Sequence, residues 1–118
     1  MEELKKHLIH TDERVEVALF MLNELGQDLT LFVVTDDNVL VGTLTDGDIR
    51  RALLKNLNIK NSVGEFINTR FKFLKEAEFS LEEVEQYKER GIRLLPVVDA
   101  QSKIKRLINF TSQSTVLP

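Results

Sequence analysis

Apolar residues recur at helical spacing in the stretch that follows Thr11 and Asp12. Both are residue types that cap the first turn of a helix, and Gly26 is the residue type that most often follows the last turn. The pattern therefore predicts an amphipathic helix that begins near Thr11 and ends at Gly26. Its apolar face consists of Val15, Ala18, Leu19, Leu22 and Leu25.

Two short apolar runs follow, at 30–35 and 40–44, and the turn-forming residues Asp36-Asp37-Asn38 lie between them. Runs of this length with apolar residues on both faces are typical of covered strands, and the turn predicts that they form a hairpin. Thr45-Asp-Gly-Asp48 then opens another helix. The apolar stripe expected for it consists of Ile49, Leu53, Leu54 and Leu57.

The second half of the chain repeats this order. A short helical turn is expected from Ser62 and an extended piece at 71–74, and Ser80 starts a helix with a capping-box pattern that ends at Gly91. This helix carries Leu81, Val84 and Tyr87 on its apolar face. Strands at 92–98 and 103–110 enclose a turn. Aligning Phe32 with Leu95 and Asp36 with Asp99 predicts one domain of two similar halves.

Composition narrows the functional classes. The 118-residue chain has a net charge of −3, which disfavours a nucleic-acid surface, and it has no Cys, which excludes thiolate chemistry. Two His, at 7 and 10, are too few and too close in sequence for an ordinary zinc site, so no metal site is expected. No apolar run approaches the ~20 residues that span a bilayer, and the first residues lack a signal-peptide pattern. We therefore expect a cytoplasmic protein without membrane or nucleic-acid partners.

Two segments resemble the CBS family, Gly42-Thr-Leu-Thr-Asp-Gly-Asp-Ile-Arg-Arg51 and Gly91-Ile-Arg-Leu-Leu-Pro-Val-Val-Asp99. The resemblance implies an α/β (α+β) CBS-domain pair, with two β-α-β-β-α repeats packed about a pseudo-twofold axis. Residues 1–118 would then be a single module, with a first motif at 1–58 and a second, degenerate motif at 59–118. No apolar pattern for a last helix follows Phe110, so the second motif is expected to lack it. The Thr-Asp-Gly-Asp-Ile-Arg-Arg run resembles in particular CBS pairs attached to sugar nucleotidyltransferases.

The resemblance also implies a nucleotide site at the start of the second helix. There the Thr45 hydroxyl and the helix start would hold phosphate, Asp48 would accept hydrogen bonds from ribose hydroxyls, and Gly42 would allow the ligand to approach closely. The physical chemistry agrees, because unsatisfied N–H groups at a helix start favour phosphate. Gly47 removes a side chain at the same place. Ile9, His10 and Thr11 stand where family members contact the base through backbone groups.

A different explanation remains open for the same residues. Thr-x-x-Asp at a helix start is also a capping pattern, and a cap needs no ligand. The two roles are compatible with each other.

The second half departs from the site pattern. Aligning its last strand with 40–44 places Arg106 at the position of Gly42, Asn109 at that of Thr45, and Ser112 at that of Asp48. The glycine, the hydroxyl and the carboxylate are all lost. We therefore expect one site per chain at most.

These observations predict a non-enzymatic regulatory module with no catalytic residues. It would bind AMP, ADP or ATP as a regulatory ligand, require no cofactor, and modulate a nucleotidyltransferase domain in cis or in trans. The surface left by the missing helix would be covered by self-association into a homodimer. The alternative is a dimerisation or docking module that binds no ligand.

Overall fold

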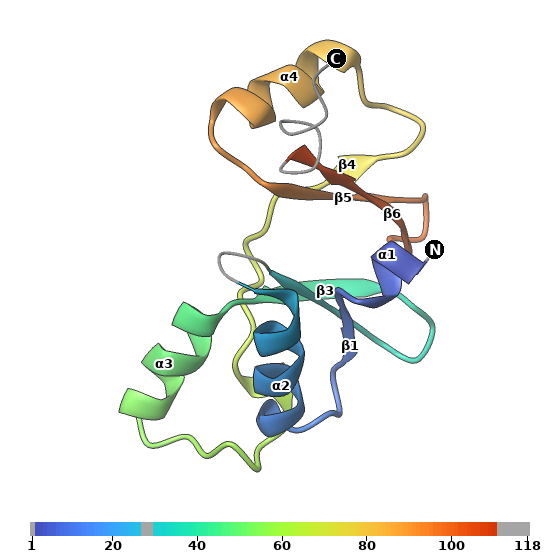
Figure 1. Cartoon of the computed structure of the whole chain (residues 1–118). Coiled ribbons are helices and arrows are strands. Elements are labelled where there is room, and N and C mark those ends of the chain that lie inside the picture. The colour runs from blue at the N-terminus through green and yellow to red at the C-terminus, as the bar shows by residue number, and fades with distance from the viewer. Residues whose placement is uncertain (1, 27–29, 111–118) are drawn as a thin grey trace. The chain divides into compact units, whose positions relative to one another are not determined.

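The computed structural model describes residues 2–26 and 30–110, which fall into two compact units, unit 1 at 1–71 and unit 2 at 72–118. Each unit is built on a three-stranded sheet of the same order, β1-β2-β3 in unit 1 and β4-β5-β6 in unit 2 (Figure 1). The predicted mixed class and the β-α-β-β order of both halves are confirmed.

Unit 1 begins with a short helix α1 (Glu2–Lys5) and then forms a parallel β-α-β unit. Strand β1 (Leu8–His10) pairs in parallel with β2 (Leu31–Val34), and helix α2 (Val15–Leu25) connects them. The predicted hairpin is confirmed, since β2 pairs antiparallel with β3 (Leu40–Leu44). Helices α2 and α3 (Asp46–Leu54) lie on one face of this sheet (Figure 1).

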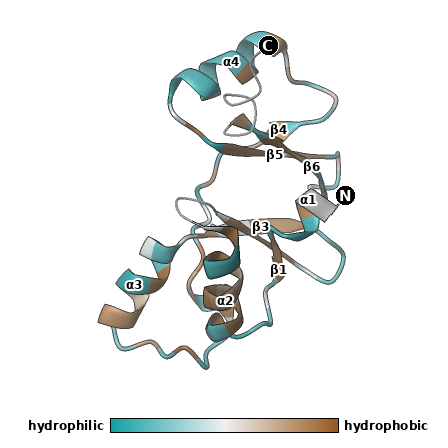
Figure 2. Cartoon of the chain, in the orientation of Figure 1, coloured by the Kyte–Doolittle hydropathy of each residue, from teal (hydrophilic) through white to brown (hydrophobic). Residues whose placement is uncertain are grey.

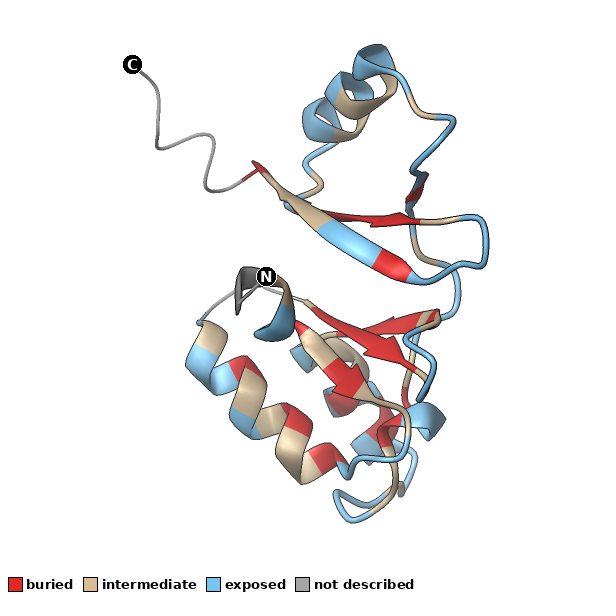
Figure 3. Ribbon diagram, turned by 90° about the vertical axis from the view of Figure 1, so that its right-hand side faces the viewer, coloured by how far each residue is buried: buried red, intermediate tan, exposed pale blue. Residues whose placement is uncertain are grey.

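The core of unit 1 lies between that sheet face and the helices. All four residues of β2 are buried, as the uninterrupted apolar run predicts (Figure 3). A short 3-10 helix η1 (Val63–Glu65), expected from Ser62 onward, closes the core. The buried cluster consists of Ile9, Val15, Ala18, Leu22, Leu31, Val33, Leu44, Ile49, Ala52, Val63 and Phe66.

The start of α2 differs from the prediction. The helix begins at Val15 with Arg14 as its N-cap residue, and no side chain caps it, so Thr11 and Asp12 are not helix caps. Backbone carbonyls do this work instead: Asn61 O accepts the Val15 N–H at 3.0 Å and Ile59 O accepts the Glu16 N–H at 3.1 Å. The sequence pattern could not show this, because the partner segment lies more than 40 residues away.

The apolar stripe predicted for α3 is wrong in part. Ile49 is buried, but the second buried residue is Ala52, while Leu53 and Leu54 are exposed. Leu54 lies five positions after Ile49, about 140° around the helix, and so faces away from the core. Figure 2 shows the resulting apolar colour at the end of α3.

Unit 2 has the same plan with a smaller core. Strand β4 (Leu74–Lys75) pairs in parallel with β5 (Leu94–Val98), and β5 pairs antiparallel with β6 (Ile104–Asn109). Helix α4 (Leu81–Glu89) connects β4 to β5 and buries none of its residues completely (Figure 3). The predicted Leu81 contact is wrong, since that side chain is exposed, whereas Val84 and Tyr87 pack on the core.

Hydrogen bonds define which positions of the two hairpins correspond. The Thr35 N–H donates to Val39 O, and the Asp99 N–H donates to Lys103 O. Asp99 is therefore the counterpart of Thr35, and its alignment with Asp36 is wrong by one residue. Thr35 and Asp99 also play the same part in their turns, although the residue types differ. The Thr35 hydroxyl and the Asp99 carboxylate each accept a backbone N–H of the turn, at 3.2 and 2.9 Å.

Both hairpins also share a register shift, between Val33 and Val34 in β2 and between Val97 and Val98 in β5. Pro96 is therefore not the cause of the irregularity, because β2 has the same shift without a proline. The predicted absence of a last helix concerns residues 111–118, which lie outside the described residues. In the part of the chain that the structure describes, no helix has the length and apolar character to cross a membrane.

Candidate functional site

The start of α3 is a complete capping box formed by Thr45 and Asp48. The Thr45 hydroxyl accepts the Asp48 N–H at 3.2 Å, and Asp48 Oδ2 accepts the Thr45 N–H at 3.0 Å. The hydroxyl also donates to the same Oδ2 at 2.9 Å. The capping explanation for these two residues is therefore confirmed, and it fixes both side chains at the end of β3.

The other oxygen of Asp48 has a different environment. Asp48 Oδ1 accepts a hydrogen bond of 2.7 Å from Arg51 Nη2, one turn further along α3. The Arg51 side chain is 68% exposed, whereas that of Asp48 is 17% exposed. A similar pair joins Arg50 to Asp46 on the outer face of the helix. Both arginines therefore form local ion pairs on a solvated helix, and only that of Arg51 reaches a predicted site residue.

The two glycines of the predicted site have different surroundings. A Cβ at Gly42 would lie 2.8 Å from Ile67 Cδ1 and 3.1 Å from the Asn68 carbonyl oxygen. The segment at Ile67 and Asn68 lies alongside β3 here, because Thr43 and Asn68 exchange two backbone hydrogen bonds in an antiparallel bridge. The close approach that requires Gly42 is thus made by the protein's own chain. At Gly47 the nearest atom is Nη1 of Arg51, 3.3 Å from a built Cβ.

His10 and Thr11 lie at the other end of the same sheet. His10 pairs with Val34 and Leu40 also pairs with Val34, whereas Leu44, next to Thr45, pairs with Leu31. Four residues of strand separate these two ends, about 13 Å. Within unit 1, Thr45, Gly47 and Asp48 therefore lie at the opposite end of the sheet from His10 and Thr11, whereas Ile9 and Gly42 both align with Val33 between these ends.

Ile9, His10 and Thr11 offer few free groups to a ligand. The Ile9 side chain is buried in the core, and Thr11 bonds through its backbone to Val34 O and Gly64 N. His10 is partly exposed, and its Nδ1 lies 3.1 Å from Asp36 Oδ1. The sequence interpretation named His10 but missed Asp36, because the contact depends on the parallel pairing of β1 and β2.

At the equivalent positions that the structure describes, unit 2 lacks the glycine and the hydroxyl of the α3 site. Val97 pairs with Arg106 as Val33 pairs with Gly42, and Leu94 pairs with Asn109, the residue that corresponds to Thr45. The predicted correspondences of Arg106 and Asn109 are confirmed, while Ser112 lies outside the described residues. The Arg106 guanidinium lies 5.8 Å from the centre of the Phe79 ring.

An open hollow of about 250 Å³ in unit 2 lies near that ring, lined by Phe73, Lys75, Glu78, Phe79 and Glu83. The two carboxylates oppose a phosphate group, so this hollow does not replace the site at α3. Sequence patterns did not indicate it.

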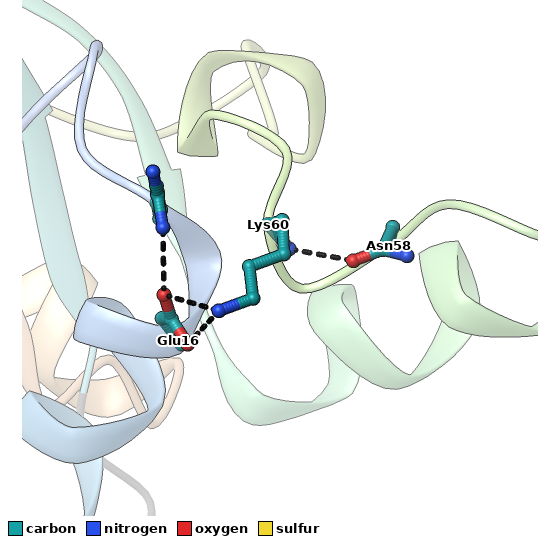
Figure 4. A network of polar contacts seen from close by, with 4 residues as sticks. Glu16, Asn58 and Lys60 are labelled. Carbon is teal, nitrogen blue, oxygen red and sulfur yellow. Dashed lines mark hydrogen bonds and ion pairs between the residues drawn. The ribbon is translucent and has the colours of Figure 1, made fainter.

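A polar network joins the segment at 58–60 to the start of α2 (Figure 4). Lys60 Nζ lies 3.3 and 3.4 Å from the two carboxylate oxygens of Glu16, and the Lys60 N–H donates to Asn58 Oδ1 at 2.8 Å. The hydrogen bond from Lys60 lowers the pKa of Glu16, and Arg14 adds to the effect. Sequence reasoning also missed His7, which is buried, with its Nδ1 3.0 Å from Thr30 O.

Comparison with known proteins supports the fold and the first motif. Residues 6–55 match the family model of the CBS domain. An uncharacterized protein of Helicobacter pylori (strain J99) is 42% identical over 79 residues, which make up 66% of this chain and 24% of the relative. The chain thus spans about a quarter of the relative that it matches.

Solved structures extend the likeness over both units. A CBS domain protein from Streptococcus pneumoniae TIGR4 gives a TM-score of 0.78 at 22% identity, covering 92% of this chain and 72% of that one. CbpB in complex with c-di-AMP gives 0.78 at 21%, covering 92% and 73%, and CBSX2 in complex with AMP gives 0.70 at 23%, covering 93% and 87%. Residues 6–55 thus match the CBS domain, and the chain as a whole has the fold of a CBS-domain pair.

Proposed function

We propose that this chain is a regulatory module that binds an adenine nucleotide at the start of α3 and modulates an attached or separate nucleotidyltransferase. The observation that carries the proposal is the arrangement of Thr45 and Asp48 at a helix start. The first N–H groups of α3, those of Asp46 and Gly47, have no acceptor within the helix, and they lie at the positive end of its dipole. A phosphate group is the ligand that such a position favours.

Asp48 can cap α3 and bind a ligand at the same time, because its two carboxylate oxygens have different partners. Oδ2 belongs to the capping box, whereas Oδ1 is held by Arg51, whose side chain is largely in solvent. An exposed ion pair contributes only about 0–1 kcal/mol, so a ligand hydroxyl can replace it at low cost. Arg51 is then free to pair with the phosphate of the same ligand.

The related structures support the ligand class. CBSX2 is described in complex with AMP and CbpB in complex with c-di-AMP, and both ligands are adenine nucleotides. The nucleotidyltransferase partner rests on the Thr45–Arg51 run, which resembles CBS pairs attached to such enzymes. Binding would alter the partner through a difference in affinity between two states of the module.

Calorimetric titration with AMP, ADP, ATP, S-adenosylmethionine and GTP tests the nucleotide site. We expect one adenine nucleotide per chain and a loss of at least about 10-fold in affinity for Asp48→Ala, which removes a charge-assisted hydrogen bond of roughly 1.5–3 kcal/mol. Ser80→Ala is the matched control, because it removes a helix cap in unit 2 without touching the site. Equal affinity of Asp48→Ala and the natural chain would refute the site.

The second candidate is a ligand-free dimerisation or docking module. Leu53 and Leu54 at the end of α3 are 39% and 80% exposed, an adjacent apolar pair on the surface of unit 1 (Figure 2). Light scattering of Leu54→Glu, with Lys55→Glu as a control for the added charge, tests this function. A dimer that Leu54→Glu disrupts, with no heat from any nucleotide, would favour docking over sensing.

A further inference from the structure

Three side chains of the types that can ligate a metal ion converge at the end of the unit 1 sheet opposite to α3. His10 ends β1, Asp12 follows two residues later, and Asp36 follows the end of β2. One ligand atom from each lies within 4.8 Å of the other two. The strands β1 and β2 are parallel, so their carboxyl ends meet at the same edge of the sheet. Residues 24 positions or more apart in sequence thus reach one point.

Backbone hydrogen bonds hold these segments in place. The Thr11 N–H donates to Val34 O at 3.0 Å, which continues the pairing of β1 and β2 beyond the named strands. The Glu13 N–H donates to His10 O at 3.1 Å, which closes the turn that carries Asp12. Main-chain contacts therefore fix the backbone segments that carry His10 and Asp12.

The cluster has more negative than positive charge. Among residues 2–26 and 30–110, neither Asp12 nor Asp36 forms an ion pair with a lysine or an arginine, and the partner of Asp36 is the His10 imidazole. Two carboxylates beside one imidazole attract a cation, because the two negative charges repel each other at short range.

The second unit shows that the fold does not need these side chains. Its strands place Lys75 at the position of His10, and the same correspondence places Ala77 and Ala100 at the positions of Asp12 and Asp36. The same β-α-β-β arrangement thus forms with a lysine and two alanines there. Packing alone does not explain three ligand side chains in unit 1.

We propose that His10, Asp12 and Asp36 bind a divalent transition-metal ion, with Zn²⁺ as the reference ion. An imidazole nitrogen favours zinc-like ions over Mg²⁺ and Ca²⁺, which take oxygen ligands. The distance of 3.1 Å between His10 Nδ1 and Asp36 Oδ1 matches the separation of about 3.3 Å between neighbouring ligands of tetrahedral zinc. The Asp36 side chain is 86% exposed and can rotate to complete the set, leaving water as the fourth ligand.

This site is separate from the nucleotide site, so either can fail without the other. Zinc chloride is titrated into the metal-free full chain by calorimetry at pH 7.5, with Mg²⁺ in parallel. We expect one Zn²⁺ per chain, at least 10-fold weaker binding for His10→Ala and for Asp36→Ala, and a change of less than twofold for Asp37→Ala. Asp37 is the matched control, because it is an exposed acid in the same turn but outside the cluster. Binding weakens at pH 5.5, since protons compete for the ligands.

The two histidines of the chain provide a second readout that does not depend on affinity. In NMR spectra, Zn²⁺ is expected to shift the imidazole signals of His10 and to leave those of the buried His7 unchanged. The circular dichroism of each variant verifies that it is folded. Zinc binding that His10→Ala and Asp36→Ala leave unaltered, or no saturable binding at 100-fold excess over the protein, would overturn the proposal.

Discussion

Unit 1 and unit 2 use the same strand order, the same parallel and antiparallel pairings and the same register shift, but they differ in what lies on the third strand. In unit 1 the segment at Ile67 and Asn68 pairs with β3 next to Gly42, where an added side chain would meet Ile67. In unit 2 the equivalent position carries Arg106, which reaches the Phe79 ring. The pairing of the strands is therefore common to both repeats, and the contacts of the third strand are specific to each.

The connecting helices show the same contrast. Helix α2 buries Val15, Ala18 and Leu22, whereas α4 has no fully buried residue. The same topology thus forms whether the connecting helix buries several side chains against its sheet or none completely. Both proposed binding sites lie in unit 1, one at the capping box of α3 and the other at His10, Asp12 and Asp36.

The largest effect is expected from Gly42→Ala. The added Cβ would lie 2.9 Å from Ile67 Cβ and 3.1 Å from the Asn68 carbonyl oxygen. Rotating the Ile67 side chain moves neither of these atoms, so the backbone of the segment must shift. Such overpacking costs about 1–3 kcal/mol of the free energy of unfolding. Urea denaturation followed by circular dichroism measures it.

Arg106→Ala is the matched variant in unit 2. It removes a cation–π contact at the surface and is expected to cost about 0.5–1 kcal/mol. If Gly42→Ala proved no more destabilising than Arg106→Ala, the contact between β3 and the segment at Ile67 and Asn68 would not be rigid.

An intermediate effect is expected from Thr45→Ala. The change removes the hydroxyl that caps α3 and leaves Asp48 with two hydrogen bonds fewer, one at its N–H and one at its carboxylate, at a cost of about 1–2 kcal/mol. Ser80→Ala removes a single bond, from the Glu83 N–H at the start of α4, and is expected to cost about half as much. Hydrogen exchange of the first-turn amides of each helix measures both. Equal losses would show that the hydrogen bond from the Thr45 hydroxyl to Asp48 Oδ2 adds nothing to the cap.

The smallest effect is expected in the pH dependence of stability, which should differ between the turn at Asp99 and the turn at Thr35. The Lys103 N–H, and then that of Gln101, lower the pKa of Asp99 below its ordinary value of 3.8, whereas Thr35 serves the unit 1 turn without a titratable group. The stabilisation by Asp99 is therefore complete above the unfolded pKa and is lost as the pH falls through the lower, folded pKa.

Asp99→Thr is expected to keep the turn and to remove this acid sensitivity. Melting temperatures between pH 5 and pH 2.5 are compared for the variant and the natural chain, with Asp37→Asn as a control for loss of a surface charge. A parallel fall of both curves would mean that Asp99 does not couple the turn to pH.

The amino-acid pattern alone was sufficient for the order of the elements from α2 onward, the hairpins, the glycines Gly26 and Gly91 that follow α2 and α4, and the cap at Thr45, but it did not predict α1 or β1. These features depend on neighbours within a few residues, and so they are encoded locally. The errors arose where a distant segment takes over a local role. The start of α2 is capped by carbonyls of Ile59 and Asn61, and the counterpart of Asp99 is set by strand pairing.

The candidate site divides in the same way. The sequence by itself determined the chemistry at the start of α3, because Thr45, Gly47 and Asp48 lie within one turn of helix. Only the tertiary structure decided that Gly42 makes room for Asn68, that His10 lies at the opposite end of the sheet from Thr45, and that Asp36 joins His10. The physical reason is that strand pairing sets distances between residues far apart in the chain, and local spacing contains no information about them.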